Sequence, residues 1–141
     1  MKDRIHKDFH GALSVGFEFL DKNYGKKAVE EYLKEVAESI YGWLIKKIKN
    51  KGLSELEKYW NEVFSEEEGE FKIKRKGDEE IVLKVEKCPA IYHMKEKGYP
   101  VYSDFCIQCK IINEVIGEKT GYNSEIKYDK KGRCEQKLRE K

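Results

Sequence analysis

Four cysteines in the second half of the chain have a spacing that could support chemistry. They are Cys88, Cys106, Cys109 and Cys134. Cys106 and Cys109 form a Cys-x-x-Cys pair, and residues three apart lie on the same side of a helix. Thiolates bind zinc and also act as nucleophiles, so the pattern indicates a metal site or a reactive thiol. A third interpretation is structural, because free cysteine is among the most buried residue types.

Zinc is the first of these interpretations. His93 follows Cys88 by five residues, which places an imidazole within reach of the thiols. Imidazole nitrogen and thiolate sulfur are preferred ligands of zinc. The predicted ligands are some or all of Cys88, Cys106, Cys109, Cys134 and His93.

Further interpretations concern particular cysteines. A redox pair of the thioredoxin type would place Cys106 and Cys109 after a strand in a βαβ unit, a context that this sequence lacks. Cys106 is expected near the start of a helix, where the helix dipole favours a thiolate if the sulfur faces a cavity. Cys134 alternates with Gln136 and Leu138, which favours a core position.

A histidine pair near the start of the chain gives an alternative metal site. His6 and His10 are four residues apart, a spacing that helical metal sites use. On a helix both rings would share one face, and His10 would border the interior. A helix surface with one hydrogen-bonded histidine is the simpler interpretation, unless the pair lies near Cys106.

The elements that must position these residues change character along the chain. Apolar residues recur at three- and four-residue steps in 3–22, in 26–49 and from Ser54 onward, which predicts three helices. Ser54 and Glu57 form a capping box that should start the third helix. The second helix is apolar over a wide arc, which is compatible with a homodimer.

Alternating patterns dominate the second half. Residues 71–85 and 126–138 each predict a β-hairpin, and helices at Pro89 and over 103–119 lie between them. The sequence therefore predicts an α+β fold, with an N-terminal helical layer packed on an antiparallel sheet that has inserted helices. We expect one domain over 1–141, with a helical half (1–66) and a sheet and cysteine-bearing half (67–141).

Composition restricts the function classes. Charged residues make up 40% of the chain but nearly cancel to a net charge of +2, which argues against a nucleic-acid binder and resembles the ion-pair-rich surfaces of thermophile proteins. No apolar run approaches the roughly 20 residues that span a bilayer, and the polar start is unlike a signal peptide. We expect a cytoplasmic protein with no membrane partner.

The segment 85–138 resembles the C-terminal half of the L-2-amino-thiazoline-4-carboxylic acid hydrolase-like family. The resemblance rests on Cys88-Pro89 after a strand, on Cys106 at a helix start, and on Gly132-Arg133-Cys134 in the last hairpin. It covers roughly the last 55 residues, and the helical half only in outline. Cys109 departs from the pattern, because the family commonly has an acidic residue there.

This resemblance implies a hydrolase that adds water to a cyclic amidine and releases a thiolate. Cys106 would be the nucleophile or a metal ligand, with Cys88 and His93 as partners and His93 as general acid or base. Arg133 would bind the substrate carboxylate.

Two tyrosines and a second, looser likeness give further hypotheses about the site. Tyr92 and Tyr102 lie next to the cysteine region and are the aromatic residues best placed to line a pocket. The architecture is also similar, more loosely, to the vinyl-reductase-type (4VR) ligand-binding domains. The sequence thus leaves open a small-molecule hydrolase, a non-enzymatic small-molecule or zinc-binding sensor-like module, and cysteines that only fill a core.

Overall fold

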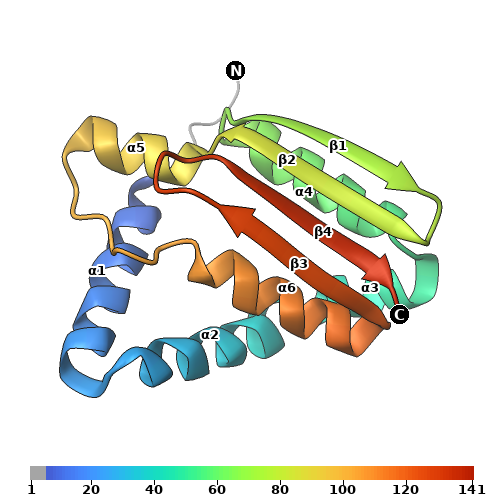
Figure 1. The fold of residues 1–141 in the computed structure, drawn as a ribbon, viewed down its shortest axis with the longest axis horizontal. Helices are drawn as coiled ribbons and strands as arrows, with labels where there is room; N and C mark the ends of the chain where they lie inside the picture. Colours follow the sequence, from blue (N-terminus) through green and yellow to red (C-terminus); the bar gives the residue numbers. More distant parts are fainter. Residues whose placement is uncertain (1–5) are drawn as a thin grey trace.

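A computed structural model describes residues 6–141, which form an α+β fold as the sequence predicts (Figure 1). Four helices come first: α1 (Asp8–Tyr24), α2 (Lys26–Ile40), α3 (Gly42–Lys51) and α4 (Ser54–Glu66). Two hairpins follow, β1 (Glu70–Lys76) with β2 (Glu80–Lys87) and β3 (Tyr122–Tyr128) with β4 (Cys134–Glu140). Between the hairpins lie α5 (Pro89–Lys97) and α6 (Ile107–Thr120).

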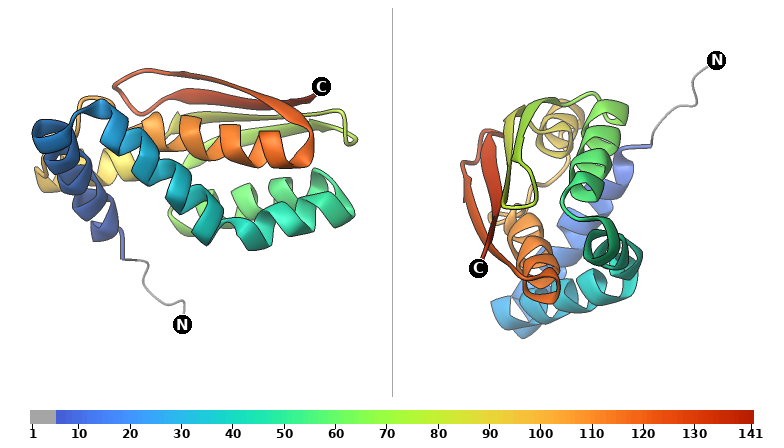
Figure 2. Two further views of the ribbon diagram at one scale, coloured as in Figure 1. Left: turned by 90° about the horizontal axis from the view of Figure 1, so that it is seen from below. Right: turned by 90° about the vertical axis from the view of Figure 1, so that its right-hand side faces the viewer.

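The sheet is antiparallel throughout and has the order β1-β2-β4-β3. The two hairpins therefore meet through β2 and β4, where Leu83 lies opposite Gln136 and Val85 opposite Cys134. All helices lie on one side of the sheet (Figure 2). Buried and less buried residues alternate along β2, because one face of the sheet packs on the helices and the other faces solvent.

Two clusters of buried side chains hold the layers together. One joins α3 and α4 to the sheet and includes Leu44, Trp60 and Leu83. The other joins α1 and α2 to α5 and α6 around Phe17. Cys88 packs against both clusters, so the junction between β2 and α5 links the two parts of the core.

The prediction of one helix over 26–49 was wrong. The chain leaves the helix at Tyr41 (φ −99°, ψ 9°), and α3 begins at Gly42. Glycine costs about 1 kcal/mol relative to alanine in a helix interior, so a break here is cheap. The break sends Leu33 into the Phe17 cluster and Leu44 into the cluster under the sheet.

The predicted capping box at the start of α4 was also wrong. Ser54 is the first residue of the helix, and its hydroxyl donates to the carbonyl of Lys51 at 3.3 Å. The backbone N–H of Leu53 donates instead to Oδ1 of Asp78, at 3.0 Å, in the turn between β1 and β2. A contact from a distant hairpin therefore fixes the helix start, which local pattern does not reveal.

α6 and β3 approach so closely that Gly117 has no room for a side chain. A Cβ there would lie 2.6 Å from the carbonyl oxygen of Tyr122. We expect Gly117→Ala to lower the free energy of unfolding by about 1–3 kcal/mol in urea titrations, since overpacking forces backbone shifts. Gly16→Ala in α1 is the control, because a Cβ there meets nothing within 4 Å. Equal stability of Gly117→Ala and wild type would contradict this packing.

Candidate ligand-binding cavity

A cavity of about 540 Å³ lies between the helices and the sheet. Its wall comes from α1, α2, α4, α6, the start of α5 and one residue of β4. Most of the wall is aliphatic or aromatic, and representative residues are Tyr32, Leu33, Trp60, Val63, Ile112 and Ile116. Tyr41, where the chain leaves α2, is itself part of the wall.

Three of the four cysteines lie in the wall of this cavity. Cys88 follows β2 and precedes the proline that begins α5, Cys106 is the N-cap residue of α6, and Cys109 lies one turn later. Cys134 is not in the wall. It packs in the core under the sheet and accepts a hydrogen bond of 3.5 Å from Nε2 of Gln136.

The environment of the cysteines keeps them as thiols. Burial, together with the nearby Cys88 and Cys134, raises the pKa of Cys106 to about 12. Burial likewise raises the pKa of Cys134 to about 11, and holds that of Cys109 well above its usual value. The helix dipole was expected to favour a thiolate at Cys106, but desolvation outweighs it. At neutral pH these sulfurs are therefore neutral and apolar.

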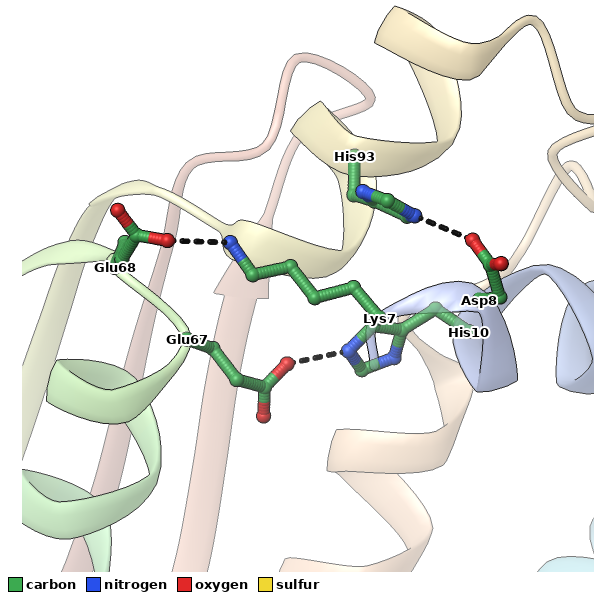
Figure 3. Close-up of polar contacts among 6 residues, drawn as sticks. All are labelled: Lys7, Asp8, His10, Glu67, Glu68 and His93. Atoms are coloured by element: carbon green, nitrogen blue, oxygen red, sulfur yellow. Dashed lines mark hydrogen bonds and ion pairs between the residues drawn. The ribbon is translucent and has the colours of Figure 1, made fainter. Parts of the chain in front are cut away.

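The predicted zinc ligands do not come together as one set. Among residues 6–141, no three His, Cys, Asp or Glu side chains are arranged to hold a metal ion. Nε2 of His93 lies 2.9 Å from Oδ1 of Asp8 (Figure 3). The same oxygen also accepts a hydrogen bond from the hydroxyl of Tyr99. His93 thus holds α5 against the start of α1 and is not among the residues of the cavity wall.

The predicted substrate-binding residues also lie outside the wall. Tyr92 is 43% exposed on α5. Tyr102 is buried, and its hydroxyl donates to Oδ2 of Asp21 at 2.7 Å. Arg133 is exposed and pairs with Asp129 at 2.9 Å. Each of the three has a structural partner or a solvent-facing position, and the cavity forms without them.

The two histidines of the alternative site are separated. His6 precedes α1 and is exposed, so it does not share a helix face with His10. His10 is buried in the cavity wall, as its position before an apolar stretch predicts. Its Nε2–H donates to Oε1 of Glu67 at 2.6 Å (Figure 3). The resulting His–Glu pair connects α1 to the end of α4.

Glu67 is a residue of the wall that the sequence pattern does not predict. It belongs to a run of three glutamates, and its neighbours Glu66 and Glu68 are exposed while Glu67 is buried. The turn after α4 places it there: Glu68 has φ 66°, and Gly69 packs so tightly that a Cβ would lie 3.0 Å from Pro89. No periodic pattern distinguishes one glutamate in such a run.

A second polar pair in the wall is neutral. Nδ2 of Asn113 on α6 donates to Oε1 of Gln136 on β4 at 2.6 Å, and both residues are buried. Their amide groups hydrogen-bond to each other, so this pair needs few hydrogen bonds from a ligand. The described part of the wall contains no lysine or arginine.

Comparisons with known proteins do not assign this chain to a family. No family model matches it, and no curated protein matches it. Among solved structures it is similar to a mutant H-NOX protein from K. algicida in the Fe(II) unliganded form, with 12% identity and a TM-score of 0.38 over 82% of this chain. The chain spans about 60% of the length of that protein. At this TM-score the likeness does not establish a shared fold.

Among residues 6–141, no helix is both long enough and apolar enough to cross a bilayer.

Proposed function

We propose that this protein is a non-enzymatic small-molecule-binding module whose cavity holds a largely apolar ligand. The cavity carries this proposal: its volume of about 540 Å³ falls within the range of about 300–1,000 Å³ that is usual for ligand pockets. Its wall is mostly aliphatic and aromatic, with two polar pairs that could orient a ligand. Such a wall gains free energy by burying apolar ligand surface.

The chemistry of the wall favours binding over hydrolysis. A hydrolase of the amino-thiazoline-carboxylate type would need a thiolate or an activated water, and a cation for the substrate carboxylate. Burial raises the thiol pKa values of Cys88, Cys106 and Cys109. His93 and Arg133, the expected general acid–base and the expected carboxylate ligand, pair with carboxylates outside the wall.

A titration with Nile red, a neutral dye that fluoresces in apolar surroundings, tests the proposal. We expect saturable binding of one dye per chain, with a blue-shifted emission that an excess of a small apolar alcohol reverses. Fluorescence that rises linearly with dye, without saturation or competition, would contradict a defined binding cavity.

Filling the cavity should abolish most of this binding. Val63 lies in the wall, and the ring of Val63→Phe would occupy space that the ligand needs. We expect the dye affinity to fall at least about tenfold, which corresponds to about 1.4 kcal/mol. Val15→Phe is the matched control, since Val15 is 52% exposed on α1 and outside the wall. Unchanged affinity in folded Val63→Phe protein would place the dye elsewhere.

A further inference from the structure

Glu67 is a carboxylate buried in an apolar wall. The residue is only 9% exposed, and its Oε1 accepts the hydrogen bond from His10. No other side chain or backbone N–H among residues 6–141 donates to this carboxylate. A buried carboxylate normally has a cationic partner or several hydrogen bonds, and the described residues give Glu67 a single hydrogen bond.

His10 reaches Glu67 through one nitrogen, Nε2, at 2.6 Å. Its Nδ1 is buried, and no hydrogen-bond partner among the described residues reaches it. A protonated imidazole carries an N–H on both nitrogens, and a buried N–H without an acceptor is unfavourable. His10 therefore offers Glu67 a single N–H, on Nε2, and its Nδ1 has no partner among the described residues.

Among residues 6–141, no lysine or arginine lines the cavity. Nζ of Lys7, the residue before α1, pairs with Oε1 of the exposed Glu68 at 3.4 Å (Figure 3). Lys7 is not part of the wall. The other polar pair, Asn113 and Gln136, is neutral.

Aromatic rings lie beside His10 and elsewhere in the cavity wall. The ring of His10 lies 3.9 Å from that of Phe9 and 6.5 Å from that of Phe105, measured between centroids. Trp60 and Phe64 of α4 line the same cavity. Aromatic faces attract cations and repel anions, so the wall adds to the preference that Glu67 creates.

We propose that the ligand of this cavity is an apolar amine, whose protonated nitrogen pairs with Glu67 while its hydrocarbon body fills the apolar space. This inference rests on the proposed ligand-binding function and deepens it. An amine of this kind is protonated at neutral pH, as a lysine side chain is. A carboxylate ligand of the same shape would be repelled by Glu67 and would meet no cation in the described wall.

Three ligands that differ only in the terminal group test the charge preference: phenylbutylamine, phenylbutanol and phenylbutanoate, each competing with Nile red for the wild-type protein. We expect the amine to bind at least tenfold more tightly than the alcohol. The carboxylate should not compete at concentrations at which the alcohol displaces all the dye. This ranking uses the wild-type chain and depends on no variant.

Glu67→Gln tests the assigned partner. We expect the affinity for the amine to fall at least tenfold, while that for the alcohol stays within about twofold of wild type. Glu66→Gln is the matched control, because this neighbour is exposed, lies outside the wall and should leave both affinities unchanged.

The outcomes separate this inference from the proposed function. If the alcohol binds as tightly as the amine, or Glu67→Gln leaves the preference for the amine intact, the amine inference is overturned and the binding function stands. If neither the dye nor any of the three ligands binds saturably, the binding function itself fails and the inference fails with it.

Discussion

Phe17→Ala is expected to lower the free energy of unfolding by about 3–5 kcal/mol, the usual range for removing a buried phenylalanine. Phe17 is fully buried and lies at the centre of the cluster that joins α1 and α2 to α5 and α6. Its ring meets those of Tyr32, Tyr102 and Phe105 at centroid distances of 6.4, 6.0 and 5.8 Å. Alanine would leave a void where three elements meet.

Phe19→Ala is the matched control for this change. Phe19 lies two residues away on the same helix but is 59% exposed, so we expect a change within about 0.5 kcal/mol. Urea titrations followed by circular dichroism measure both variants. Similar losses for the two variants would mean that the buried face of α1 is assigned incorrectly.

Alkylation of Cys106 in the folded protein is expected to be about a thousandfold slower than that of an unperturbed thiol, because only the thiolate reacts. Burial raises its pKa from the ordinary 9.0 to about 12, which lowers the thiolate fraction at neutral pH by that factor. Cys109 should also react slowly, since burial raises its pKa well above the usual value. Their position at the cavity wall limits access of the reagent as well.

Iodoacetamide labelling followed by peptide mass mapping measures each thiol separately. In urea we expect all four cysteines to react alike, which controls for reagent and assignment. One cysteine that reacts in the folded protein as fast as free cysteine would contradict the described environment. If that cysteine is Cys106, the result would instead support the nucleophile that the hydrolase resemblance implies.

Local patterns in the sequence were sufficient for the fold class and for most of the strands. The alternation around Leu83 predicts a hairpin because it depends on residues two apart, and the structure confirms it. The start of α4 depends on the hydrogen bond to Asp78 in the β1–β2 turn. The break at Tyr41 depends on the packing of Leu33 and Leu44 in different clusters. Such long-range contacts leave no periodic trace in the sequence.

The cavity was partly foreseen from the cysteines. Their spacing led to Cys88, Cys106 and Cys109, which the structure places in one wall. The ionisation of a thiol depends on its burial, which spacing does not encode. Glu67 was missed because it pairs with His10 across 57 residues and lies in an acidic run that looks solvent-exposed.

Diffraction from crystals held under xenon pressure tests the central claim most directly, because xenon enters apolar cavities that are open to small molecules. We expect xenon density inside the protein, bordered by Trp60 of α4 and by Cys109 and Ile112 of α6. Side chains that fill this space, with no xenon between them, would contradict the account.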